Sequence, residues 1–227
     1  IYYDPLQQAL QAPPKVRFTV KNGTGYEAGE PGSLYLPDAK LFAELADEFE
    51  YVRLFGVTNW TPTNLVVSNI VMIFTDIDLR VTNDVRLDGN AELHLGYSLP
   101  TNPVGAFRQL QCANLVLTNG GDLYVYSQPT NLMATNHGAR VAVTGGVTVT
   151  SNTWIYPVTH ARHGGTVKFE VGALRVDLWG GINANGRGYR GGEGWSGWGY
   201  GPGRGTCSSY YGGGGGHGGR GGNGSNG

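Results

Sequence analysis

The chain is poor in charge and almost free of cysteine. Charged residues make up 15% of its 227 residues and the formal net charge is −1, whereas an ordinary soluble domain has roughly 25% charged residues. The basic residues are scattered along the sequence, so they form no positive patch of the kind that holds nucleic acid or an anionic membrane surface. We therefore expect no nucleic-acid partner.

Long apolar runs are missing as well. No uninterrupted stretch approaches the roughly 18 apolar residues that a membrane-spanning helix needs. The first five residues, IYYDP, have neither the basic start nor the apolar middle of a signal peptide. We expect a soluble, processed chain without a membrane span.

Cys112 and Cys207 are the only two cysteines. In an oxidising compartment they could form a disulfide that ties the C-terminal segment to the rest of the chain, with a typical stabilisation of about 2 to 4 kcal/mol. Two separate buried thiols are the alternative that their number and spacing leave open.

Glycine is present in excess, with 39 residues, and it is concentrated beyond residue 180. Residues 180–227 therefore form a predicted glycine-rich segment. Hydrophobic burial cannot order such a segment, because glycine has no side chain and loses the most backbone entropy on folding. Backbone hydrogen bonding is the force that remains. We expect a packing segment of polyglycine helix or glycine-lined strand at Gly212, Gly213, Gly214, Gly215 and Gly216.

Residues 1–36 are the first predicted segment, an extended arm that proline-containing turns interrupt. Within it Val16, Phe18 and Val20 alternate with polar residues, which predicts one strand. A strand on such an arm could add to the sheet of a neighbouring copy. Val16, Phe18 and Val20 are therefore the candidate inter-subunit strand.

Residues 37–52 carry the one helical pattern of the sequence. Asp38 is a suitable start, and the apolar residues that would share one helical face are Leu41, Phe42, Leu45, Phe49 and Val52. We expect a short amphipathic helix that caps an open end of an all-β core.

Residues 53–179 are the predicted body. Short runs rich in Val, Ile, Leu, Thr and Tyr alternate with polar residues and are separated by Asn, Gly and Asp turns, which is typical of strands with one buried face. The phrases at 64–69 (NLVVSN) and 114–119 (NLVLTN) look like one motif used twice. The predicted fold is all-β, a right-handed parallel β-helix or solenoid, with a β-sandwich as the alternative.

The polar residues of the body supply only weak candidates for chemistry. Some parallel β-helix enzymes present carboxylates or calcium on one face, and the residues concerned would be Asp76, Asp78, Asp84, Asp88 and Glu92. We expect them on solvated strand faces and in turns. His160 and His163, with His137 and His217 elsewhere, lack the further ligands of a zinc site. We predict no enzyme activity, no metal and no cofactor.

Aromatic residues support a rival hypothesis, a polysaccharide-binding or polysaccharide-degrading protein. Rings that could stack on sugars are Trp154, Tyr156, Trp179, Trp195 and Trp198. A line of exposed rings in one groove with carboxylates between them would favour that function. Rings buried against glycine backbone would argue against it.

The second half of the chain carries a resemblance. Residues 147–160 (VTVTSNTWIYPVTH), 164–171 (GGTVKFEV) and 180–189 (GGINANGRGY) lead into the glycine-rich end. Together they resemble the glycine-rich, autotransporter-like β-helix proteins secreted by bacteria of the Verrucomicrobia and Planctomycetes type, which are usually much longer. The resemblance implies a secreted or cell-surface β-helix with a structural role, and it transfers no catalytic residue.

These observations lead to one main functional hypothesis. The chain is expected to be an extracellular structural protein that self-assembles into a surface filament, fibre or sheath, with contacts through the arm and the glycine-rich segment. A polysaccharide partner, or adhesion to another cell surface by a monomer, is the alternative.

Overall fold

The computed structural model describes residues 4–8, 10, 18–20, 32–46, 49–97, 108–129, 137–189, 200–201, 207–208 and 211–212, and these are almost entirely β. Within these ranges the one helix is α1 (Pro5–Gln8), and no helix is long and apolar enough to cross a membrane. The strands are β1 (Phe18–Thr19), β2 (Ser33–Tyr35), β3 (Leu45–Ala46), β4 (Phe49–Glu50), β5 (Val52–Phe55), β6 (Asn59–Trp60), β7 (Leu65–Ser68), β8 (Val71–Phe74), β9 (Asp78–Arg80), β10 (Asp84–Asp88), β11 (Glu92–Leu95), β12 (Arg108–Cys112), β13 (Asn114–Leu117), β14 (Asp122–Tyr126), β15 (Ala139–Val149), β16 (Trp154–Val158), β17 (Val167–Val176), β18 (Gly181–Ile182), β19 (Cys207–Ser208) and β20 (Tyr211–Gly212).

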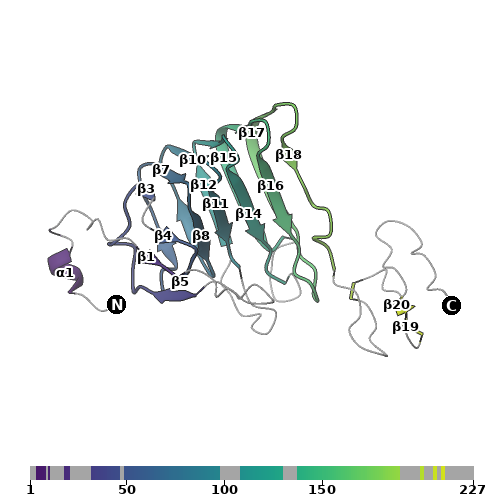
Figure 1. The fold of residues 1–227 in the computed structure, drawn as a ribbon, viewed down its shortest axis with the longest axis horizontal. Coiled ribbons are helices and arrows are strands. Elements are labelled where there is room, and N and C mark those ends of the chain that lie inside the picture. Colours follow the sequence, from purple (N-terminus) through teal and green to yellow (C-terminus); the bar gives the residue numbers. More distant parts are fainter. Residues whose placement is uncertain are drawn as a thin grey trace.

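Two curled sheets of parallel strands make up the body, and Figure 1 shows their strands stacked side by side along one axis. One sheet has the order β2-β5-β8-β11-β14-β16-β18. The other has the order β3-β7-β10-β13-β15-β12-β9-β6, with β17 paired to β15. Every strand pair within these two sheets is parallel, whereas β19 and β20 form a separate antiparallel pair. The all-β prediction is confirmed, and the parallel pairing does not match the antiparallel sheets of a β-sandwich.

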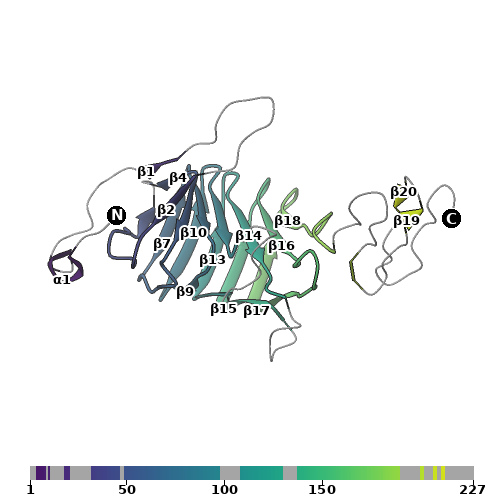
Figure 2. The same ribbon diagram turned by 90° about the horizontal axis from the view of Figure 1, so that it is seen from below.

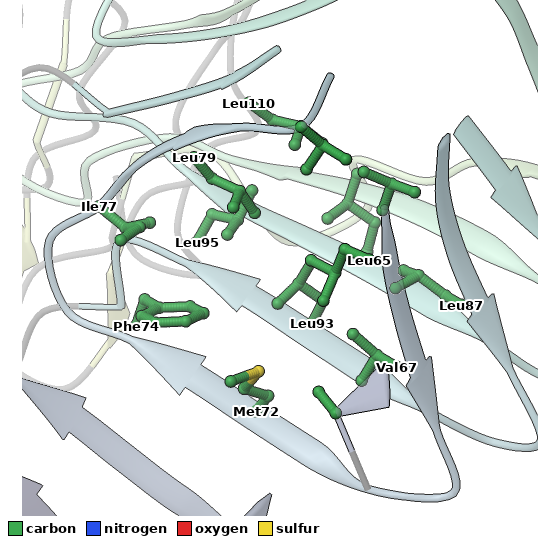
Figure 3. Close-up of a cluster of buried hydrophobic side chains, with 14 of the residues drawn as sticks. Leu65, Val67, Met72, Phe74, Ile77, Leu79, Leu87, Leu93, Leu95 and Leu110 are labelled. Atoms are coloured by element: carbon green, nitrogen blue, oxygen red, sulfur yellow. The ribbon is translucent and has the colours of Figure 1, made fainter. Parts of the chain in front are cut away.

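The strands of both sheets are in register, so that inward side chains form rows along the body. Leu65 is aligned with Val85, Val85 with Leu115, and Leu115 with Val147. Alternation explains the rows, because successive side chains of a strand point to opposite faces. Figure 3 shows Leu65, Leu87 and Leu93 among the side chains that meet between the sheets. One continuous apolar core results.

Asparagine turns separate the strands of the two sheets. Asn69, Asn90, Asn119 and Asn152 each follow a strand of one sheet, precede a strand of the other, and have φ between 51° and 60°. Asparagine is one of the few residues that adopt this left-handed conformation readily. The repeated phrases at 64–69 and 114–119 thus form the same unit, a strand followed by an Asn turn.

The predicted capping helix at residues 37–52 is wrong. Its described part consists of turns and the strands β3, β4 and the start of β5. Leu41, Phe42 and Val52 are buried as expected, whereas Leu45 is 49% exposed. Leu41 and Phe42 reach the core from an irregular turn rather than from a helix face. The parallel sheets therefore begin at Ser33, inside the segments predicted as arm and helix. Tertiary pairing overrode a helical apolar pattern.

An aromatic cluster closes the N-terminal end of the core. The ring centroids of Phe42 and Trp60 are 4.9 Å apart, those of Phe42 and Phe74 are 6.0 Å apart, and all three side chains are at most 7% exposed. Leu36 at 0% and Leu41 at 6% exposure complete the cover. Figure 2 shows this end and the end formed by β17 and β18 on opposite sides of the body.

Candidate functional site

A column of stacked rings lies on the outer face of the sheet that contains β11, β14 and β16. His94 is aligned with Tyr124, and Tyr124 with Tyr156. The ring centroids of His94 and Tyr124 are 4.2 Å apart, and those of Tyr124 and Tyr156 are 4.4 Å apart, with interplanar angles of 7° and 20°. Neighbouring strands are spaced by about 4.8 Å, so rings in register stack face to face. The ring faces therefore cover one another.

His94 is held at both ring nitrogens. Its Nδ1 lies 3.1 Å from the Tyr126 hydroxyl and its Nε2 lies 2.9 Å from a carboxylate oxygen of Glu92. The His94 side chain is 11% exposed. These contacts fix the ring orientation.

Arg187 covers the edge of the column. Its guanidinium carbon lies 4.6 Å from the ring centroid of Tyr156 and 5.2 Å from that of Tyr124. The Nε atom is buried without a hydrogen-bond partner, while the Arg187 carbonyl accepts a hydrogen bond from the Thr159 amide at 2.9 Å. Cation–π contact and backbone pairing together attach the chain after β18 to the sheet.

Two carboxylates lie side by side next to the column. Glu92 of β11 is aligned with Asp122 of β14, and the Asp122 carboxylate accepts a hydrogen bond of 2.7 Å from the Trp154 amide. Burial and, to a smaller extent, the negative charge of Glu92 outweigh the lowering effect of the Trp154 amide and together raise the pKa of Asp122 to about 6. Asp122 therefore takes up a proton in mildly acidic solution.

The five aromatic residues predicted to bind sugar do not form an open line. Tyr156 is stacked, and Trp154 lies over Gly181, where an added Cβ would be 3.0 Å from the indole ring. This is the packing against glycine backbone that argues against sugar binding. Trp179 is 72% exposed, and Trp195 and Trp198 lie outside the described residues.

The C-terminal end of the core is open. Along one core row Leu65, Val85 and Leu115 are 0% exposed and Val147 is 3% exposed, but Leu174 on β17 is 50% exposed. No further strand of the described chain covers Leu174. An inward-facing leucine thus meets solvent.

Other core rows end in the same way. Val149 is 0% exposed and its aligned neighbour Val176 is 43% exposed; Ile155 is 1% exposed and its neighbour Ile182 is 45% exposed. Val171 on the first half of β17 is 37% exposed. Strands β17 and β18 therefore present an apolar edge to solvent at this end of the body. An exposed apolar patch of this kind marks a contact surface in soluble proteins.

The row of asparagine turns ends in a tryptophan. Trp179 has φ 67° and occupies the turn between β17 and β18, where the preceding turns have Asn. Its carbonyl accepts a hydrogen bond from the Asn152 amide at 3.1 Å. A bulky residue in the left-handed region is strained, and both Trp179 and Leu178 are more than 70% exposed, at 72% and 74%. The strained turn extends the apolar edge.

The predicted carboxylates lie on strand faces and at strand ends, and most have nearby partners. Asp78 forms an ion pair with Arg80 at 2.8 Å, and Asp88 forms one with Arg86 at 3.2 Å. Asp84 accepts a hydrogen bond from the Asn114 side chain. Asp76 lies just before β9. Within the described ranges no three metal-binding side chains converge.

The histidines at 160 and 163 form a turn. The Nδ1 atom of His160 accepts hydrogen bonds from the amides of Arg162 and His163, and the two imidazole rings stack at 5.3 Å. Burial and the neighbouring positive groups lower the pKa of His160. His160 and His163 are therefore polar residues of a turn. His137 lies before β15, and His217 is outside the described residues.

Cys112 is a free, buried thiol on β12, with 2% of its surface exposed. Burial raises the pKa of its thiol to about 12, so it is a poor nucleophile. Cys112 is thus a free thiol in this structure, and the side chain of Cys207, its predicted disulfide partner, lies outside the described residues.

The candidate inter-subunit strand pairs within its own chain. β1 is parallel to β4, with Phe18 aligned with Phe49, and the Val20 amide donates a hydrogen bond to the Glu50 carbonyl. Phe18 and Val20 also pack against the core. One edge of this strand is therefore occupied, and Val16 lies outside the described residues. Of the glycine packing segment only Gly212, in β20, is described.

The column and the open edge were not predicted from the sequence. His94, Tyr124 and Tyr156 occupy outward positions of the strands that follow Asn turns, and this shared position is the signal that could have aligned them. The exposure of Leu174 had no sequence signal, because its strand has the same apolar alternation as the buried strands.

Comparison with known proteins adds no assignment. No family model matches the chain, and no curated protein or solved structure is similar enough to count as a match.

Proposed function

We propose that this chain is a non-catalytic extracellular structural protein whose body is a right-handed parallel β-helix, and that it self-assembles in a surface filament, fibre or sheath. The alternation of the chain between the two sheets supports the β-helix: β7, β8 and β9 are followed by β10, β11 and β12 in aligned positions. Right-handedness follows from the strong preference of parallel crossovers.

The open C-terminal edge is the observation that carries self-assembly. Solenoid proteins need a polar cap on their terminal coils to stay soluble alone. Here Leu174, Val176 and Ile182 end three core rows with 43% to 50% exposure. Burial of these side chains against another molecule would stabilise the association through the hydrophobic effect.

The polar groups support a non-catalytic role. Asp78 and Asp88 are paired with arginines, and the Cys112 thiol is buried with a raised pKa. Catalytic groups are instead typically arranged around a cleft that admits substrate.

The direct test is a concentration series by light scattering with electron microscopy of the same samples. We expect the average mass to rise with concentration and regular assemblies to appear. A monomer at every concentration would overturn the proposal.

A second candidate is a polysaccharide-binding surface protein. It is favoured by Glu92 and Asp122, which lie in register beside the tyrosine column. Titration with neutral and acidic polysaccharides would show saturable binding that Tyr156→Ala weakens. Equal affinity of the wild-type protein and the Tyr156→Ala variant for every polysaccharide would exclude this site.

A further inference from the structure

The edge strand β17 is self-complementary in charge. Its outward side chains are Lys168 and Glu170 in the first half and Arg175 in the second, followed by Asp177 just after the strand. The signs run plus, minus, plus, minus. When such a strand is laid antiparallel on a copy of itself, each positive residue can face a negative one.

We propose that β17 pairs antiparallel with β17 of a second copy of this chain, so that two bodies join at their open ends about a two-fold axis. The axis passes between Gly172 and Ala173. Glu170 then faces Arg175 of the second copy, and Lys168 faces its Asp177. The proposal rests on the proposed self-assembly and names its contact surface and partner.

The same register pairs the apolar residues. Val171 faces Leu174 of the second copy, and Phe169 faces its Val176. All four point toward the core in their own chain, because they are aligned with inward residues of β15. Inward residues thus meet inward residues and outward residues meet outward residues, as directly opposed positions in an antiparallel pair require.

Neighbouring registers are unfavourable. A shift by two residues in one direction places Lys168 opposite Arg175, and a shift in the other direction places Glu170 opposite Asp177. Like charges directly opposed destabilise a strand pair. A shift by one residue sets Phe169 against Arg175 and mixes the two faces. Charge and apolar pattern therefore select one register.

The shape of β17 agrees with this two-fold contact. The strand pairs with both halves of β15, on either side of an irregularity between Val143 and Gly146. Rotation about an axis at the middle of β17 lays its first half on the second half of the copy. Such an isologous interface is closed, so a filament would need a second contact at another surface.

The available charges suit an intermolecular role. Lys168 forms an ion pair with Glu170 at 2.6 Å, and Arg175 forms one with Asp177 at 3.0 Å, within one chain. The Lys168 side chain is 49% exposed and that of Arg175 is 73% exposed. These groups can face a second copy while they keep their local partners.

A charge reversal at Arg175 tests the contact, with a matched reversal inside the body as control. Arg86 lies in the same outward row and pairs with the aspartate two residues on, as Arg175 does. We expect Arg175→Glu to weaken dimerisation about tenfold or more in sedimentation equilibrium, since it opposes two carboxylates at both ends of the contact. Arg86→Glu should leave the dissociation constant within about twofold.

A mixing experiment separates pairing from loss of folding. Lys168→Glu alone places two carboxylates opposite each other, and Asp177→Lys alone places two ammonium groups opposite each other. Each variant alone should therefore be monomeric. Their equimolar mixture restores opposite charges at both positions and should form a heterodimer. A dimer that tolerates Arg175→Glu as well as Arg86→Glu would overturn this contact while self-assembly stands. A wild-type monomer at all concentrations would remove the proposed function together with it.

The chain's own C-terminal segment is the competing occupant of the edge. If deletion of residues 190–227 converts a wild-type monomer into a dimer, that segment covers the open end and the proposed contact is wrong for the full chain. A dimer of unchanged affinity after the deletion supports the contact between copies.

Discussion

The two ends of the body are built from the same strand pattern and finish differently. At the N-terminal end Leu36 is 0% exposed and the rings of Phe42 and Trp60 are buried, whereas at the C-terminal end Leu174 is 50% exposed. The difference shows that the apolar residues of the strands do not by themselves cover the end of the core. A cap requires side chains from outside the repeat, and the described chain supplies them at one end only.

The largest expected effect compares one leucine at each end. Leu36→Ala should lower the free energy of unfolding by about 2 to 5 kcal/mol because it leaves a cavity. Leu174→Ala should cost less than about half as much in a dilute sample, because half of that side chain is already in water. Urea unfolding followed by circular dichroism measures both. Equal losses would mean that the C-terminal end is covered in solution.

Relief of strain at Trp179 should have the next largest effect. Trp179→Asn places in the last turn the residue that the preceding turns use at the same φ. We expect the free energy of unfolding to rise by about 1 kcal/mol. Asn152→Trp, the reverse change one turn earlier, should lower it. Thermal denaturation measures both variants. Melting temperatures that shift in the same direction in the two variants would contradict this account.

Removal of Arg187 should loosen the segment that follows the open end. Arg187→Ala loses the contact with Tyr124 and Tyr156, which we expect to cost about 1 kcal/mol. Arg187→Lys should restore only part of it, because lysine lacks the planar stacking surface. Hydrogen exchange at the Thr159 amide, which bonds to Arg187, should speed up in the alanine variant and leave exchange near Trp60 unchanged.

The smallest effect concerns pH. The pKa of Asp122 is raised to about 6 in the folded chain, so the folded state binds its proton more tightly than the unfolded state. Its contribution therefore makes stability fall as pH rises through the interval from about 4 to 6. Asp122→Asn should remove this slope, and the difference between the two proteins in urea midpoints across that interval measures it. Parallel pH profiles would exclude the effect.

Much of the body could be predicted from local pattern. Alternation in residues 114–117 and 122–126 predicted strands with one buried face, and both are strands with alternating burial. The Asn turns were visible as repeated phrases because their backbone requires a residue that tolerates positive φ. The helix at residues 37–52 failed because Leu41 and Phe42 fit a helical face and an irregular cap equally well.

The sequence by itself determined the all-β class, the short strands and the turns between them, since these depend on neighbouring residues and on a period of two. Only the tertiary structure decided that His94, Tyr124 and Tyr156 form one column, because residues 30 or more positions apart meet through parallel register. The tertiary structure also decided that the core row ending at Leu174 stays exposed to solvent. Burial depends on whether another strand follows in space, and alternation within a single strand does not contain that information.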